Sequence, residues 1–187
     1  MTDMKLEAQD FLRLCEGNHS IAFLDIEATN LKADYGSTLV VSIKPYNQEI
    51  TTFSVLQPGN DQKIVRQASE LLAEYDCWVT YYGKGFDVPF LNTRLLKWGY
   101  KPIPKRPHLD LYFSIQPKLL MSRKSQAQLL GFLQTYEQKM GLSPNVWNEV
   151  LHDPKAMKTM IARCESDVKG LQNGYDKVKH LVAEIKR

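Results

Sequence analysis

Short apolar runs with two different spacings divide the chain into predicted strands and helices. Runs rich in β-branched and aromatic side chains predict strands at about 20–27, 38–43, 50–55, 77–81 and 108–112. Apolar residues at helical spacing predict helices at about 5–16, 62–75, 88–98, 124–140 and 154–186, the last with room for one break. Asn47-Gln48 predicts a hairpin turn between the second and third strands, and Gly83-Lys84-Gly85 a loop before the third helix.

The order of these elements predicts the fold class. A hairpin at the start, followed by strands that alternate with helices, is typical of an α/β protein with a mixed five-stranded sheet and helices on both faces. A chain of 187 residues is long enough for one domain with its own core. We find no repeat, low-complexity tract or linker, and therefore expect a single domain over residues 1–187.

The amino-acid composition is typical of a globular protein and gives no direct sign of a nucleic-acid, zinc or membrane partner. The hydrophobic fraction is 43% and the net charge only +3, so a basic surface for nucleic acid would have to come from local placement. The cysteines, Cys15, Cys77 and Cys164, are far apart, and neither they nor the four histidines have zinc-ligand spacing. Without a long apolar segment or a signal-peptide pattern, we expect a soluble, cytoplasmic protein with no membrane partner.

Two acids at the end of the first predicted strand are the strongest chemical signal. Side chains alternate faces along a strand, so Asp25 and Glu27 point the same way. Two carboxylates on one buried face repel each other and lose hydration, which a bound cation would offset. Oxygen ligands alone favour Mg²⁺ or Mn²⁺ over Zn²⁺. The alternative to a metal site is that the strand ends here and Asp25 and Glu27 begin a polar loop.

Two further acids occupy positions that suit a metal site. Asp87 follows a glycine loop and opens a predicted helix, where it could instead be the helix N-cap. Asp167 lies at the edge of the apolar stripe of the last helix, beside Gly170 and Gly174. These glycines are unfavourable inside a helix and suggest close approach by a strand or a substrate. The alternative for Asp167 is a boundary acid in a salt bridge.

Taken together, the three acidic motifs resemble the DEDD superfamily of 3′–5′ exonucleases, which have a ribonuclease H-like fold. The chain is most similar to the bacterial YprB-like branch and to the proofreading domains of family B DNA polymerases. The resemblance covers about residues 20–175. Its most specific part is the second motif, Tyr82-Gly83-Lys84-Gly85-Phe86-Asp87-Val88-Pro89-Phe90-Leu91, and the strand His108-Leu109-Asp110-Leu111 is also similar.

This resemblance implies a function and a set of site residues. It implies a two-metal-dependent 3′–5′ exonuclease that acts on DNA or RNA ends, single-stranded ends being the expected substrate. Two Mg²⁺ or Mn²⁺ ions would be held by Asp25, Glu27, Asp87 and Asp167, with Asp25 between the ions. Thr29 and Leu31 match positions that meet the terminal nucleotide. Around the second motif we expect substrate contacts from Tyr82, Lys84 and Phe86.

The chain departs from the family pattern in three places. Tyr82 replaces an asparagine of the second motif. Asn30 replaces a glycine, and asparagine can keep a left-handed turn there. The third motif usually has a tyrosine four residues, or a histidine five residues, before its acid, but here these positions are Arg163 and Ala162. Arginine cannot accept a proton, although Arg163 could bind a phosphate or pair with Asp167.

These departures leave two alternatives to an exonuclease. The chain could be a catalytically weak or inactive nucleic-acid-binding protein on the same fold, or a ribonuclease H-like endonuclease. Two basic segments could follow a substrate backbone or only face solvent: Lys97, Lys101, Lys105 and Arg106, and Lys118, Arg123 and Lys124. Asp110 could support the site or lie at its boundary. The sequence does not distinguish DNA from RNA and does not give the oligomeric state.

Overall fold

The computed structural model describes residues 20–57, 59–135, 146, 149–150 and 152–183, and it contains one five-stranded sheet in the order β3-β2-β1-β4-β5. β1 (Ile21–Ala28), β2 (Thr38–Pro45) and β3 (Thr51–Ser54) pair antiparallel. On the other side of β1, β4 (Cys77–Thr80) and β5 (His108–Asp110) pair in parallel. The predicted mixed sheet is therefore confirmed. The helix predicted at 5–16 lies outside the described residues.

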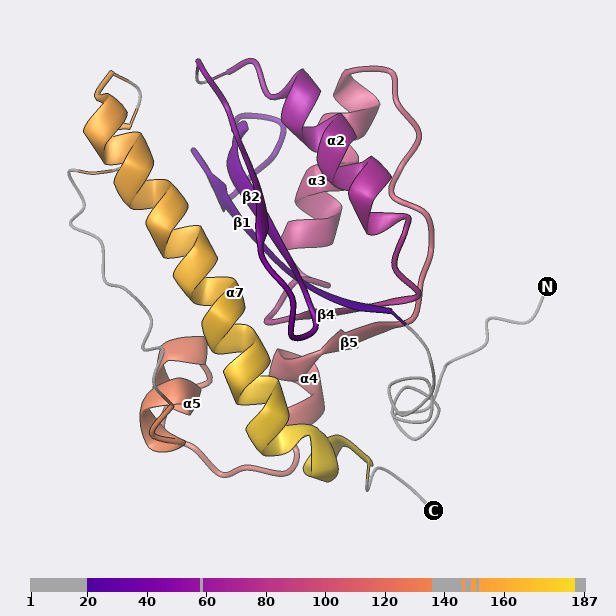
Figure 1. Cartoon of the computed structure of the whole chain (residues 1–187), viewed down its shortest axis with the longest axis vertical. Coiled ribbons are helices and arrows are strands. Elements are labelled where there is room, and N and C mark those ends of the chain that lie inside the picture. Colours follow the sequence, from indigo (N-terminus) through magenta and orange to yellow (C-terminus); the bar gives the residue numbers. More distant parts are fainter. Residues whose placement is uncertain (1–19, 58, 136–145, 147–148, 151, 184–187) are drawn as a thin grey trace.

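Helices cover both faces of the sheet, as predicted (Figure 1). α2 (Gln62–Leu72) and α3 (Asp87–Lys97) pack on one face, and α7 (Pro154–Ala183) packs against β1 and β2 on the other. The shorter helices α4 (Leu111–Ile115) and α5 (Gln126–Phe132) contact α7. α7 runs over 30 residues without a break. None of the described helices is both long and apolar enough to cross a membrane.

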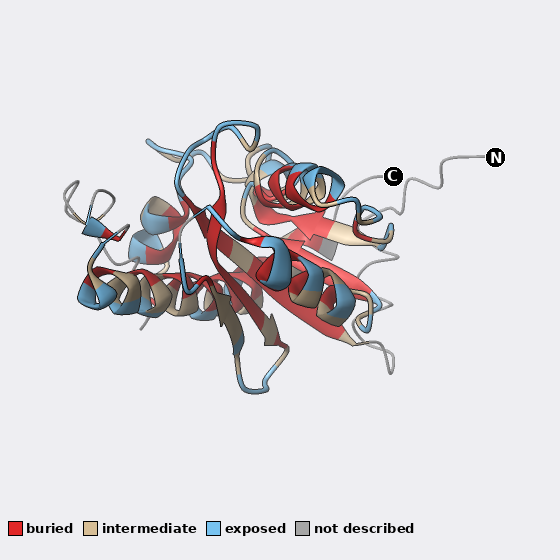
Figure 2. Ribbon diagram, turned by 90° about the horizontal axis from the view of Figure 1, so that it is seen from above, coloured by how far each residue is buried: buried red, intermediate tan, exposed pale blue. Residues whose placement is uncertain are grey.

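The alternation of side chains along β1 determines which layer each residue enters. Leu24 belongs to the core cluster shared with α2 and α3, whereas Phe23 packs edge-on against Tyr175 of α7, with ring centroids 5.6 Å apart. Figure 2 shows the buried strands between helices whose outer faces are exposed. Because Asp25 and Glu27 follow Phe23 at intervals of two, they point toward α7.

Two predicted elements differ from the structure, and the predicted hairpin turn is confirmed. The strand expected at 108–112 ends at Asp110, because the Asp110 carboxylate accepts the Tyr112 N–H at 3.0 Å and caps α4. The helix expected at 124–140 ends at Phe132 within the described residues, and residues 136–140 lie outside them. The hairpin turn is centred on Asn47, whose φ is 57°. Asparagine adopts this left-handed conformation more readily than most residues.

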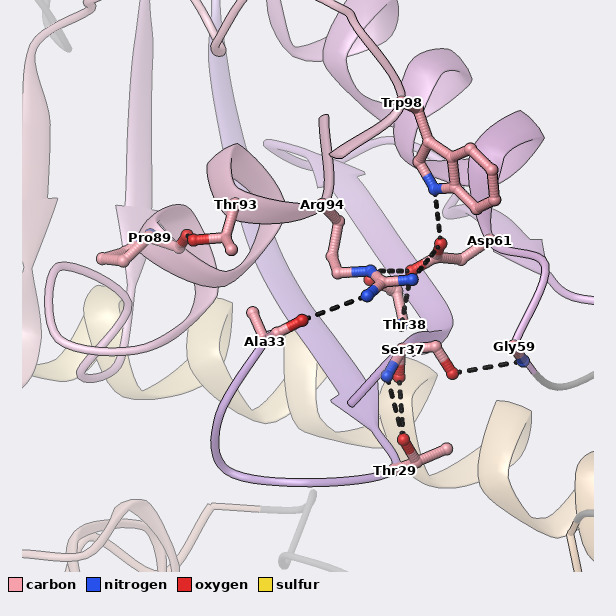
Figure 3. Close-up of polar contacts among 10 residues, drawn as sticks. All are labelled: Thr29, Ala33, Ser37, Thr38, Gly59, Asp61, Pro89, Thr93, Arg94 and Trp98. Carbon is pink, nitrogen blue, oxygen red and sulfur yellow. Dashed lines mark hydrogen bonds and ion pairs between the residues drawn. The ribbon is translucent and has the colours of Figure 1, made fainter. Parts of the chain in front are cut away.

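A buried ion pair joins α3 to the start of α2. Arg94 donates through Nε to Asp61 Oδ2 at 2.8 Å and through Nη2 to Asp61 Oδ1 at 2.9 Å (Figure 3). The Trp98 indole N–H donates to the same carboxylate at 2.8 Å. The two charged side chains are almost fully buried, at 2% and 0% exposed. Such a pair depends on a complete set of hydrogen bonds to offset its desolvation.

The same network fixes the loop that follows β1. Arg94 Nη1 donates to the Ala33 carbonyl at 3.0 Å, and the Thr38 N–H donates to Asp61 Oδ2 at 2.8 Å (Figure 3). Burial by itself would raise the pKa of Asp61, but the hydrogen bonds from Arg94, Thr38 and Trp98 outweigh it and hold that pKa below its usual value. Asp61 therefore stays ionised and ties the β1–β2 loop to the two helices.

We predict that Arg94→Met destabilises the fold by about 3–5 kcal/mol, because it leaves the Asp61 carboxylate buried without its cation. Urea unfolding followed by circular dichroism measures this loss. The matched control is Arg66→Ala, which breaks an exposed pair with Glu70 (2.7 Å) and should cost less than about 1 kcal/mol. If both substitutions cost the same, the Asp61–Arg94 pair does not anchor the loop.

Candidate active site

A cavity of about 490 Å³ opens where β1 and β4 diverge. The parallel pairing of these strands runs only from Ile21 and Cys77 to Phe23 and Val79, although β1 continues to Ala28. In open α/β sheets, ligands commonly bind at the carboxyl ends of strands where the connection order reverses. The cavity is lined by residues 25–31, Tyr81, Tyr82, Phe86, Asp87, Arg163 and Asp167.

Three carboxylates form a tight cluster on one wall of this cavity. Asp25, Glu27 and Asp167 each offer an oxygen atom, and these oxygens lie within 4.8 Å of one another. Glu27 and Asp167 are buried, and Asp25 is half-buried. A cluster of oxygen ligands without sulfur or nitrogen fits Mg²⁺ or Mn²⁺. The donor set therefore suits a divalent metal, and these three residues would supply its first ligands.

The packing of α7 on β1 brings the third carboxylate to the other two. Cys164 of α7 donates through its thiol to the Asp25 carbonyl at 3.3 Å. Burial raises the pKa of the Cys164 thiol well above its usual value, and the nearby Asp25 charge raises it further, so the thiol keeps its proton. From α5, the Gln126 amide donates to the Asp167 carbonyl at 2.8 Å. These contacts fix how closely α7 packs against β1 and which of its side chains face the cluster.

Asp87 lines the same cavity but lies outside the three-acid cluster. It is the first residue of α3 and is only 5% exposed. Its Oδ1 accepts the Ile26 N–H of β1 at 3.1 Å. The residue at the N-cap position is Phe86, and no side chain caps this end of α3. The alternative interpretation of Asp87 as a helix N-cap is therefore wrong, and its carboxylate joins α3 to β1 beside the cluster.

Arg163 places a permanent cation inside the acidic cluster. Its Nε lies 2.6 Å from Glu27 Oε1 and 3.8 Å from Asp167 Oδ2, and its side chain is 18% exposed. The sequence suggested a pair with Asp167 or a phosphate, but the shorter contact is to Glu27. A guanidinium cannot take a proton from water, so Arg163 cannot be a general base. It does balance part of the negative charge of the cluster.

The loop after β1 forms a second wall of the cavity, and it keeps a turn at Asn30. Thr29 Oγ1 accepts the Ser37 N–H at 2.9 Å and closes the loop, while Leu31 is 81% exposed at the cavity. The turn at Asn30 is kept, but without the left-handed conformation that asparagine tolerates. Instead, its side chain accepts the Lys32 N–H at 3.1 Å. This turn needs no positive φ because the side-chain oxygen closes it.

The second-motif residues divide between the cavity and its surroundings. Tyr82 and Phe86 line the cavity, and the Phe86 ring packs against Phe90 with centroids 5.4 Å apart. Lys84 is exposed and does not line it. Tyr82 has a φ of 66°, which is unusual for an aromatic residue and requires support from its neighbours.

Asp110 supplies that support, which the sequence raised only as the alternative to a boundary position. It is fully buried and accepts the N–H groups of Tyr82 and Lys84, both at 2.8 Å, in addition to that of Tyr112. The expectation of a boundary acid is wrong. An acid between two apolar residues, Leu109 and Leu111, was the available signal. Burial raises the pKa of Asp110, although the three N–H donors act in the opposite direction.

His108 offers no general base to the site. It pairs with Thr80 Oγ1 at 2.8 Å and does not line the cavity. Burial, with a smaller contribution from Lys84, lowers the pKa of His108 to about 3, so the ring is neutral at ordinary pH. The cavity has no histidine among its described lining residues.

The two basic segments have different surroundings. Arg106 donates to the Ala73 carbonyl at 3.0 Å, and Lys118 donates to the Leu181 carbonyl at 2.6 Å, so both side chains contact backbone. Lys97 ends α3, about 15 Å along the helix from the Asp87 end that reaches the cavity. Arg123 and Lys124 are exposed, and the Lys124 carbonyl accepts the Tyr81 hydroxyl at 2.9 Å. Lys124 therefore lies beside Tyr81, which lines the cavity.

Comparison with known proteins agrees with this fold. A sequence profile of the RNase_H superfamily matches residues 22–179, and the chain therefore belongs to this superfamily of nucleases. No curated protein matches at a significant level. Among solved structures, the chain is similar to the family B DNA polymerase from the hyperthermophilic archaeon Pyrobaculum calidifontis, with a TM-score of 0.71 at 19% identity. The match covers 87% of this chain and 25% of the polymerase, and it confirms the ribonuclease H-like fold.

We predict that Arg163→Gln raises the affinity for Mn²⁺ roughly tenfold or more. Removing a unit charge about 5 Å from a divalent ion is worth more than about 1.4 kcal/mol even in water. Titration calorimetry with Mn²⁺ measures the change. The matched control is Arg123→Gln, an exposed residue outside the cavity, which should leave the affinity unchanged. Equal or weaker binding by Arg163→Gln would show that the guanidinium does not compete with a metal.

Proposed function

We propose that this chain is a divalent-metal-dependent 3′–5′ exonuclease that acts on DNA or RNA ends. The observation that supports the proposal best is the cluster of Asp25, Glu27 and Asp167, whose oxygens lie within 4.8 Å at a cavity that Asp87 also lines. Nucleases of this superfamily generally use divalent metals, and the cluster has the corresponding donor chemistry. Mg²⁺ or Mn²⁺ is the expected ion, and the resemblance implies two.

The residues around the cluster would hold the substrate. When bound, the ions would supply an activated water and stabilise the leaving 3′ oxygen. Thr29 and Leu31 form the wall nearest the end of β1, so the terminal nucleotide would lie against them. Tyr82 and Phe86 line the cavity from the loop after β4 and give aromatic surface for a base. A cavity of about 490 Å³ suits a nucleotide-sized ligand.

The replacement of the usual third-motif tyrosine or histidine by Arg163 and Ala162 makes a slow enzyme the expected form. A positioned base typically contributes about 10²–10⁴-fold to the rate, and Arg163 cannot act as one. The guanidinium could instead bind the scissile phosphate, for which its planar fork is well suited. A second candidate function is nucleic-acid binding without cleavage. The 2.6 Å contact between Arg163 and Glu27 favours this candidate, because it occupies a proposed metal ligand.

We predict that the purified protein shortens 5′-labelled single-stranded oligonucleotides from the 3′ end in Mn²⁺ or Mg²⁺. EDTA should stop the reaction, and Asp25→Asn should abolish it because the cluster loses a charged ligand. Denaturing gels of both end-labelled forms give the direction. A circular single strand separates the alternatives, because only an endonuclease would open it. Shortening from the 5′ end or activity in EDTA would contradict the proposal.

We predict that Arg163→Tyr keeps the fold and raises the rate of cleavage by up to about 10²-fold, since it restores the residue type of the third motif and frees Glu27. Single-turnover cleavage at saturating substrate measures the chemical step. Arg163→Phe is the matched control, because it removes the cation without adding a hydroxyl. If Arg163→Tyr inactivates a functional wild-type enzyme, the arginine takes part in the reaction.

A further inference from the structure

Four aromatic rings form a continuous surface beside the cavity. Tyr81 and Tyr82 come from the loop after β4, and Tyr112 and Phe113 from α4; we call these four residues the aromatic patch. The Tyr82 ring lies 4.8 Å from Tyr112 and 5.7 Å from Phe113 between centroids, and Tyr81 lies 6.0 Å from Tyr112. Tyr82 and Phe113 are 45% and 49% exposed. The patch therefore presents two rings to solvent on a support of two others.

One residue of this exposed surface, Tyr82, has an unfavourable backbone conformation that the surrounding structure must stabilise. Tyr82 has the left-handed φ of 66°, which is unfavourable for an aromatic residue. The buried Asp110 carboxylate holds both halves of the patch, because it accepts the N–H groups of Tyr82 and Tyr112. Gly85 gives the Tyr82 ring its place, since a Cβ at Gly85 would lie 2.6 Å from that ring. Strained residues held by such support commonly mark functional sites.

The position of the aromatic patch indicates its ligand. Tyr81 and Tyr82 line the cavity that contains the acidic cluster, so the patch is continuous with it. Exposed basic residues border the patch: Lys84 follows Tyr82 by two residues, and the Tyr81 hydroxyl donates to the backbone of Lys124. Exposed aromatic faces beside cations are the features with which proteins bind single strands, because rings stack on bases while cations attract phosphates.

We propose that the aromatic patch binds the unpaired bases of a single-stranded nucleic acid whose end lies in the cavity. This inference rests on the proposed function and adds to it a base-binding surface, formed in part by α4, outside the cavity. A base-paired end would keep its faces stacked within the duplex and could not use the rings. Phe113 is the most informative residue of the patch, because it belongs to α4, does not line the cavity and lies outside the acidic cluster.

The test separates stacking from general apolar contact. The probes are a 5′-fluorescein-labelled twelve-nucleotide oligo(dT), the matching oligo(U), and an abasic strand of the same length. Binding is followed by fluorescence anisotropy in Ca²⁺. The wild type should bind either base-containing strand roughly tenfold more tightly than the abasic one. Phe113→Leu keeps an apolar side chain but removes the flat face, so it should lose most of that difference, whereas Phe113→Trp should retain it.

The matched control is Phe132→Leu on α5, an exposed aromatic residue (66%) that makes none of the patch contacts, and it should bind like the wild type. Equal binding by Phe113→Leu and Phe132→Leu, with 3′ trimming intact, would overturn this inference and leave the proposed function standing. Equal affinity for a blunt duplex would also overturn it. A wild-type protein that binds none of the probes and cleaves nothing would overturn both.

Discussion

The concentration of negative charge at the end of β1 is the constraint on which the site depends. The pleat of the strand directs Asp25 and Glu27 to the same face, and α7 brings Asp167 to within 4.8 Å of them. Buried like charges at this distance repel each other and lose hydration, so they require a cation. Arg163 supplies one from within the chain, at 2.6 Å from Glu27. A divalent ion would supply more charge and use the same oxygens.

Two other buried acids, Asp61 and Asp110, are structural and do not belong to the cluster, because each is paired with hydrogen-bond donors. Asp61 receives hydrogen bonds from Arg94, Trp98 and a backbone N–H, and it fixes the loop after β1. Asp110 receives three backbone N–H groups and fixes the loop after β4 together with α4. Each of these loops forms a wall of the cavity. The acids that surround the site therefore hold it in shape, while the acids within it face one another.

The sequence predicted the elements whose causes are local. Apolar periodicity predicted the five strands and the helices of both layers, and the spacing of Asp25 and Glu27 predicted that they share a face. It could not predict contacts between distant segments. The burial of Asp110 under the loop after β4 depends on the N–H groups of Tyr82 and Lys84, far away in the sequence, and the partner of Arg163 depends on how α7 lies against β1. Motif spacing alone therefore suggested Asp167 or a phosphate as the partner of Arg163, and it did not decide between support of the site and a boundary position for Asp110.

The relation between Arg163 and a metal is the central question for this protein, and a crystal structure in saturating Mn²⁺ answers it most directly. Anomalous scattering identifies Mn²⁺ without reference to activity. Our account predicts an anomalous peak among the carboxylates of Asp25, Glu27 and Asp167, with the Arg163 guanidinium moved away from Glu27. A structure with no peak at the cluster and the Arg163–Glu27 contact intact would contradict it, because the acids would then be satisfied by the arginine alone.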